Sequence, residues 1–111
     1  MSPPRTIAVV TGTRADFGLL RPVIGAILEH PGLELRLAVT GTHLLPPAHT
    51  AEEVRRAFPV SIEIPMQRSG AVGRAADAEA LGRGVSGFAA WLGSRPADWL
   101  LVLGDRIEAL A

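Results

Sequence analysis

Residues 6–20 read TIAVVTGTRADFGLL, and this stretch decides the fold that we expect. Residues 6–11 form a short apolar run, which is typical of a parallel strand covered by helices on both faces. A turn of small residues that contains Arg14 follows, and a helical pattern begins soon after it. A strand, a turn and a helix start in this order present backbone N–H groups and a positive helix end to an anion. The stretch therefore predicts a β-α unit with a candidate phosphate-binding turn.

The rest of the chain repeats this alternation. Apolar residues at helical spacing and shorter apolar runs predict three helices and three further strands: helices over 17–30, 50–58 and 74–92, and strands over 33–40, 60–65 and 99–103. The strand at 60–65 alternates and ends in a proline, so we expect it at a sheet edge, whereas the strand at 99–103 should be buried. A last helix begins at 107. This β-α-β-α-β-α-β order predicts an α/β fold with a doubly wound parallel sheet in the strand order 3-2-1-4.

Two local features test this assignment. Pro22 is compatible with the first helix only if it lies in the first turn. Gly82, Gly84 and Gly87 lie inside the third predicted helix, where each costs about 1 kcal/mol relative to alanine. We expect close packing against the sheet to require these three glycines.

Composition narrows the class of protein. The chain has 111 residues, which is about one domain, and 48% of them are hydrophobic. Eleven arginines balance eleven acidic residues, so disorder and an electrostatic partner such as nucleic acid or an acidic membrane are not expected. There is no cysteine, no signal-peptide pattern at the start and no apolar run long enough for a membrane span. We therefore expect a soluble cytoplasmic protein.

Polar residues follow three of the predicted strands, at the points where those strands end. Arg14 follows the first strand, His43 the second, and Asp105 with Arg106 the fourth. Because the carboxyl ends of parallel strands meet at one edge of a sheet, we expect these side chains at a common rim, where such folds bind ligands. The two guanidinium groups suit phosphate, and His43 could donate to a phosphate or a sugar. Asp105 is the candidate for proton transfer.

Each candidate also has a plainer structural interpretation. Arg14 fits an ordinary β-α turn, His43 a histidine that is hydrogen-bonded within its own loop, and Asp105 a helix cap. Asp16 is expected to cap a helix, and Glu108 to compensate a helix dipole. The glycine spacing of a dinucleotide-binding turn is missing, so nicotinamide cofactors are not expected. The three histidines are too dispersed in the sequence for a metal site.

Three motifs together carry a family resemblance. Residues 12–20 (GTRADFGLL), 41–44 (GTHL) and 102–111 (VLGDRIEALA), in this order, resemble the N-terminal part of the UDP-N-acetylglucosamine 2-epimerases. The resemblance is to the hydrolysing branch, which supplies N-acetylmannosamine for sialic-acid-type sugars. It implies two Rossmann-like domains of the glycosyltransferase-B type, with the active site between them. Residues 46–49 (PPAH) depart from the family, which has a glycine and an aromatic residue in this segment.

The resemblance also implies chemistry. Such an enzyme eliminates UDP from the sugar to give an unsaturated glycal, then adds water to release N-acetylmannosamine, and it uses no metal or nicotinamide. Arg14 would contact the phosphate region, Asp105 would belong to the acid/base set, Arg106 would stabilise the departing diphosphate and His43 would line the cleft.

The same resemblance bounds what this chain would do alone. Residues 1–111 would be a partial N-terminal domain, inactive without the UDP-binding domain, and the full-length protein would form a homo-oligomer. Two other interpretations stay open: a non-catalytic α/β module that binds nucleotide sugars, and the acceptor domain of a related glycosyltransferase-B enzyme.

Overall fold

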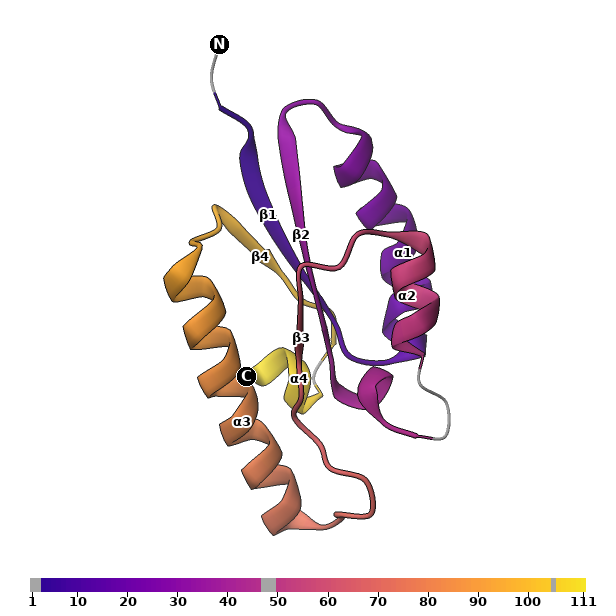
Figure 1. The fold of residues 1–111 in the computed structure, drawn as a ribbon, viewed down its shortest axis with the longest axis vertical. Coiled ribbons are helices and arrows are strands. Elements are labelled where there is room, and N and C mark those ends of the chain that lie inside the picture. Colours follow the sequence, from indigo (N-terminus) through magenta and orange to yellow (C-terminus); the bar gives the residue numbers. More distant parts are fainter. Residues whose placement is uncertain (1–2, 47–49, 105) are drawn as a thin grey trace.

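Four parallel strands form the centre of the computed structural model, which describes residues 3–46, 50–104 and 106–111 (Figure 1). The strands are β1 (Arg5–Thr11), β2 (Leu33–Thr40), β3 (Ile62–Ile64) and β4 (Trp99–Leu101). They lie in the order β3-β2-β1-β4, and every neighbouring pair is parallel. The expected α/β class and strand order are therefore confirmed.

β1 is paired with β2 along its whole length, and the outer two strands are paired only briefly. β1 and β2 run in register from Arg5 opposite Leu33 to Thr11 opposite Val39. β4 pairs with β1 over three residues, and β3 pairs with β2 over three. β3 is an edge strand, as expected. Since all four strands are parallel, their carboxyl ends lie at one edge of the sheet, which is the edge where the polar turns were expected.

Helices cover both faces of this sheet (Figure 1). α1 (Arg14–Glu29) and α2 (Ala51–Ala57) pack on one face, where Val9, Leu37 and Val39 supply the strand side of the core. α3 (Arg74–Ser94) packs on the other face against Ala8, Val10 and Ala38. α4 (Ile107–Leu110) joins this second cluster, and the 3-10 helix η1 (Gly41–Leu44) follows β2. Apolar residues on both sides of β1 and β2 are thus buried, which is the doubly wound arrangement.

The prediction that the fourth strand is buried is wrong. The side chains of Trp99 and Leu100 are exposed over 65% and 48% of their surface. β4 lies at the outer edge of the sheet, and in the described part of the chain nothing pairs with its far side. An apolar sequence showed that the strand prefers burial, but it could not show which neighbour covers it.

The restriction placed on Pro22 is also wrong. α1 begins at Arg14, three residues before the predicted start, so Pro22 lies in the middle of the helix. A proline there leaves the carbonyl four residues earlier without its helical N–H partner. That residue is Gly18, and both Gly18 and Pro22 lie on the exposed side of the helix. Water can therefore take the place of the missing N–H group.

Two of the three glycines in α3 are explained by packing. A Cβ atom on Gly87 would lie 2.5 Å from Ile64 Cγ2, and one on Gly84 would lie 2.6 Å from Met66 Cε. Gly82 has nothing within 4 Å of its Cβ position, so the expectation fails for this residue. Among the described residues, no helix is both long and apolar enough to cross a membrane.

Candidate functional site

Turns from four strands meet at the carboxyl edge of the sheet. Gly12 follows β1, Gly41 follows β2, Gln67 follows β3 and α4 follows β4. The backbone N–H of His43 and the hydroxyl of Thr42 both donate to the carbonyl oxygen of Gly12, over 3.3 and 3.1 Å. These two hydrogen bonds join the turns after β1 and β2, and we call the joined turns the floor of the site.

Asp16 occupies the start of α1. Its Oδ2 atom accepts hydrogen bonds from the backbone N–H groups of Gly12 and Thr13, at 3.0 and 3.1 Å. The N–H of Asp16 in turn donates to the Thr13 hydroxyl, which completes a capping box. The expectation that Asp16 is a cap is confirmed. The N–H groups of Gly12 and Thr13 belong to the turn that we expected to bind an anion. They already donate to the Asp16 carboxylate of the same chain.

Arg14 is in the first turn of α1 and points into solvent. Its side chain is 75% exposed, and its Nε atom lies 3.3 Å from Glu53 Oε2 of α2. An ion pair this exposed contributes little stability, so a ligand phosphate can compete for the guanidinium at small cost. Arg14 keeps the access that a phosphate-binding residue needs.

His43 does not face the open rim as expected. Its side chain is fully buried, with Nε2 2.9 Å from the Thr11 hydroxyl and Nδ1 2.7 Å from the Thr50 hydroxyl. Thr11 donates its single hydroxyl proton to Asp16 Oδ1 over 2.5 Å, so Nε2 must be the protonated nitrogen. Nδ1 then accepts from Thr50. The plainer interpretation, a histidine hydrogen-bonded within its own loop, is met only in part, because one of the two partners, Thr11, belongs to β1.

Burial lowers the pKa of His43 below its ordinary value near 6.5. The negative charges of Asp16, Glu53 and Glu108 act in the opposite direction but are outweighed. His43 is therefore a neutral imidazole at pH 7.

The turn after β4 is described in part. Asp105 lies outside the described residues, as do residues 47–49, so the structure does not place the expected acid or most of the divergent loop. Arg106 is the N-cap residue of α4 and has a side chain that is more than half exposed. Its Nε atom lies 3.2 Å from Glu108 Oε2.

Glu108 is the residue that sequence reasoning missed. It was expected only to compensate a helix dipole, but its side chain is 5% exposed and lies under the turns of β1 and β2. Gln67 Nε2 donates to its Oε1 atom over 2.5 Å. Gly12 and Gly41 at two strand ends were the available signal, because turns without side chains leave space that another residue must fill.

Two hollows flank the Glu108–Gln67 pair. The smaller one lies between the ends of β1 and β4 and is bordered by Gly12, Arg106 and Glu108. The larger one, of about 450 Å³, lies beyond β2 and β3 and is bordered by Gln67, Glu63, Arg55 and His43 among others. No three His, Asp or Glu side chains of the described residues form a metal-binding group.

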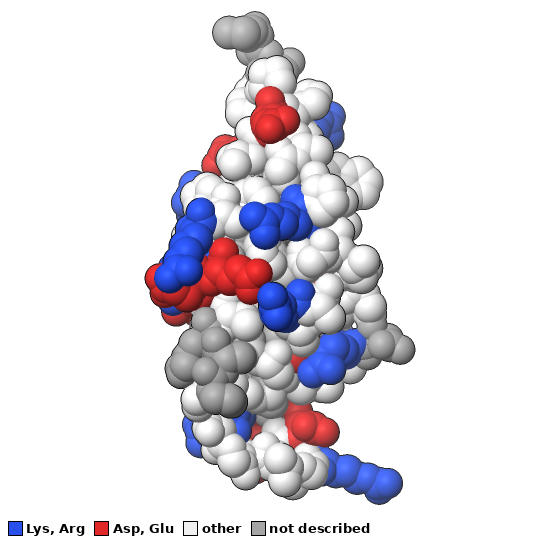
Figure 2. All heavy atoms as spheres, turned by 90° about the vertical axis from the view of Figure 1, so that its right-hand side faces the viewer, with Lys and Arg blue, Asp and Glu red and all other residues white. Residues whose placement is uncertain are grey.

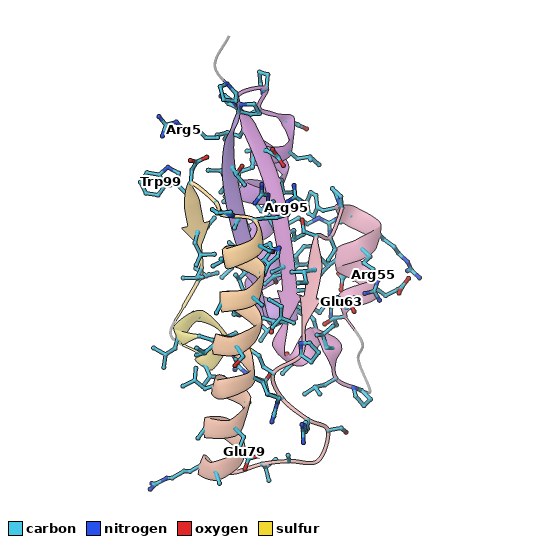
Figure 3. The ribbon with its side chains drawn as sticks, turned by 60° about the vertical axis from the view of Figure 1, so that its left-hand side comes forward. Arg5, Arg55, Glu63, Glu79, Arg95 and Trp99 are labelled. Atoms are coloured by element: carbon cyan, nitrogen blue, oxygen red, sulfur yellow. The ribbon has the colours of Figure 1, made fainter. Side chains whose placement is uncertain are left out.

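Charged pairs border the larger hollow. Figure 3 shows Arg55 of α2 beside Glu63 of β3, and the two side chains are hydrogen-bonded. Arg55 also pairs with Glu52 of its own helix. Acidic and arginine side chains accordingly lie next to each other on the α1 and α2 side of the molecule (Figure 2). With both signs present, this surface carries no strong net field for an anion.

Comparison with known proteins identifies 2-epimerases as relatives of this chain. No family model matches the chain. It is 36% identical over 113 residues to a UDP-N-acetylglucosamine 2-epimerase of Neisseria meningitidis serogroup B, and the alignment covers 96% of this chain. It is 37% identical over 109 residues to the hydrolysing UDP-N,N'-diacetylbacillosamine 2-epimerase of Legionella pneumophila. This chain is homologous to the N-terminal part of the UDP-N-acetylglucosamine 2-epimerases.

Solved structures of such 2-epimerases have the same fold. A crystal structure of UDP-GlcNAc 2-epimerase from Neisseria meningitidis, bound to UDP-GlcNAc, matches 94% of this chain with a TM-score of 0.76 at 18% identity. Another UDP-N-acetylglucosamine 2-epimerase matches 98% of the chain with a TM-score of 0.77 at 17% identity. The chain spans 28% and 29% of the length of the Neisseria and Legionella relatives. The resemblance seen in the sequence motifs is thus confirmed for an N-terminal part.

Proposed function

We propose that this chain is the N-terminal portion of a hydrolysing UDP-N-acetylglucosamine 2-epimerase, which converts UDP-N-acetylglucosamine and water into N-acetylmannosamine and UDP. The observation that carries the proposal is the 36% identity to a 2-epimerase over 96% of this chain. The geometry supports it, because two exposed arginines stand on turns at the carboxyl edge of the sheet. A second domain, which completes the cleft and holds the uridine, belongs to the proposal.

The reaction assigns a task to each turn. In the elimination step the C2 proton is removed and the C1–O bond breaks, so that UDP leaves and a glycal remains. Water then adds, placing hydroxyl on C1 and a proton on C2. Arg14 contacts the phosphate region, Arg106 stabilises the departing diphosphate, and Asp105 belongs to the carboxylates that move protons. His43 supports the wall of the cleft from below.

We propose the hydrolysing branch because two of the relatives are hydrolysing enzymes. The Legionella protein and a third relative from Campylobacter jejuni, 29% identical, are both hydrolysing 2-epimerases of diacetylbacillosamine nucleotides. The near equality of 36% and 37% identity makes UDP-N,N'-diacetylbacillosamine a second candidate substrate. Both candidates share the UDP leaving group, so the roles above serve either.

Release of UDP by the full-length protein that contains this chain tests the proposal. We expect turnover of one of the two UDP-sugars, with a higher kcat/KM for the true substrate. Asp105→Asn should lower kcat by about 100-fold or more, because a general acid or base contributes about that much. Asp98→Asn is the matched control, since Asp98 binds the Thr6 N–H at the opposite end of the sheet. No UDP release from either sugar would contradict the proposal.

A further inference from the structure

Glu108 is a buried carboxylate for which the proposed reaction has not yet given a use. Both of its oxygens are engaged, Oε1 by Gln67 Nε2 at 2.5 Å and Oε2 by Arg106 Nε at 3.2 Å. We propose that Glu108 is a positioning residue that holds Arg106 in place for the departing diphosphate. The contact between Glu108 and Arg106 is observed in the structure. Its effect on catalysis rests on the proposed function.

The packing around Glu108 is built for this side chain. A Cβ atom on Gly12 would lie 2.7 Å from Glu108 Cγ, and one on Gly41 would lie 2.9 Å from the same atom. Any other residue at either glycine would displace the side chain. The Glu108 side chain therefore packs against the turns after β1 and β2, and this packing fixes the segment after β4 next to them.

Both polar neighbours of the Glu108 carboxyl group are hydrogen-bond donors. Gln67 Nε2 donates to Oε1 and Arg106 Nε donates to Oε2, and Glu108 and Arg106 form an ion pair. A buried negative charge needs a positive partner, and Arg106 supplies it. The two charges hold each other at the base of the small hollow that Gly12 and Val102 also border.

The contact through Nε leaves the useful end of Arg106 available. Among the residues that the structure describes, only the Nε atom of this guanidinium has a hydrogen-bond partner. Its two terminal amino groups can then make a bidentate contact with a phosphate. A diphosphate gains negative charge as the C1–O bond breaks, so a guanidinium fixed beforehand stabilises the transition state more than the bound substrate.

Glu108→Gln isolates the charge from the shape. The glutamine amide has the same volume, and its oxygen can still accept from Arg106 Nε. Its amide nitrogen can donate to Gln67 once the Gln67 amide turns over, because Gln67 Oε1 has no hydrogen-bond partner within the described residues. We therefore expect the variant to fold and to lose the ionic hold on Arg106.

A double-mutant cycle in the full-length protein tests the inference. Glu108→Gln should lower kcat about 10-fold or more while KM changes less than about 3-fold, as expected for a contact that strengthens in the transition state. In an Arg106→Met background the same substitution should have little further effect, because its target is gone. Glu34→Gln, which removes the partner of Arg36 on β2, is the matched control and should keep full activity.

The outcomes separate the two proposals. Equal effects of Glu108→Gln with and without Arg106 would overturn the positioning role and leave the epimerase intact. A wild-type protein that releases no UDP would overturn the function instead. The hold itself is then measured by the Nε–H signal of Arg106 in NMR spectra, which should exchange slowly in the wild type and faster in Glu108→Gln. An unchanged signal would contradict the inference.

Discussion

Gly41 shows how a single residue fixes the geometry of the site. Its φ is 63°, in the left-handed region that favours glycine, and its Cβ position lies 2.6 Å from the carbonyl oxygen of Gly12. A side chain here would strain the backbone and separate the turns after β1 and β2. The floor beneath the proposed cleft therefore depends on the absence of two side chains, and not only on the charged groups around it.

Gly41→Ala is expected to destabilise the chain by about 2 kcal/mol or more, from backbone strain and overpacking together. Gly25→Ala is the control, because Gly25 lies within α1 and has nothing within 4 Å of its Cβ position. That substitution should stabilise by up to about 1 kcal/mol. Urea unfolding curves of both variants measure the difference. An unchanged free energy of unfolding in Gly41→Ala would show that the turns after β1 and β2 can move apart without cost.

His43 makes stability depend on pH. Its pKa is lowered in the folded chain and ordinary in the unfolded chain, so the unfolded chain binds more protons below pH 6.5. The free energy of unfolding should therefore fall as pH drops from 6.5 toward the lowered pKa, by at most about 1.4 kcal/mol per pH unit. Above pH 7 the contribution is fully present.

Urea unfolding between pH 5 and 7.5 checks this expectation. His43→Gln should remove most of the slope in that window, whereas His30→Gln should retain it, since His30 is exposed. An identical slope in wild type and His43→Gln would mean that His43 keeps its ordinary pKa when folded.

At the scale of elements, local patterns predicted most of the fold. β2 was found with its bounds from its apolar run, and α3 was located from helical spacing. The predicted start of α1 lies three residues too late, at residue 17 instead of Arg14. The capping box of Thr13 and Asp16 begins the helix before the apolar periodicity appears. Residues that act within one element or turn were visible in this way.

Contacts between elements were not visible in the same patterns. The burial of His43 depends on Thr11 and Thr50, which come from two other segments. The burial of Glu108 depends on Gly41 and Gly12, which lie 67 and 96 positions earlier in the chain. No local sequence pattern indicates such a distant contact. The sequence therefore predicted where the site lies, at the carboxyl edge of the sheet. The buried side chains that position its turns could be identified only in the structure.

The glycines of α3 give a matched pair within one helix. Gly87→Ala should destabilise by about 1–3 kcal/mol, because the new methyl group would meet Ile64, a stiff β-branched residue of β3. Gly82→Ala should stabilise by up to about 1 kcal/mol, since its Cβ position is open. Thermal unfolding of the two variants should shift in opposite directions. Shifts of the same sign would contradict the packing of α3 on β3.

At the scale of the whole molecule, large apolar side chains are exposed along and near the outer strand β4. Trp99 and Leu100 lie on the strand, and Leu110 of α4 is 72% exposed. Figure 3 shows Trp99 at this outer edge of the sheet, near Arg5. A sheet edge with exposed apolar side chains favours association with another chain.

Residues 1–111 alone are accordingly expected to self-associate as concentration rises. Light scattering coupled to gel filtration should show an increasing mass that Trp99→Arg reduces. Val72→Arg, at an exposed valine in the loop before α3, should leave the mass unchanged. A monomer at all concentrations would show that the edge is protected by its own side chains.

The claim that this chain begins a hydrolysing 2-epimerase is tested most directly by ³¹P NMR of UDP-N-acetylglucosamine during turnover by the full-length protein. Hydrolysis predicts that the diphosphate signals of the sugar nucleotide disappear and those of free UDP grow at the same rate. An epimerase that keeps the nucleotide on the sugar would change the sugar signals while no free UDP accumulates. That second result would contradict the account.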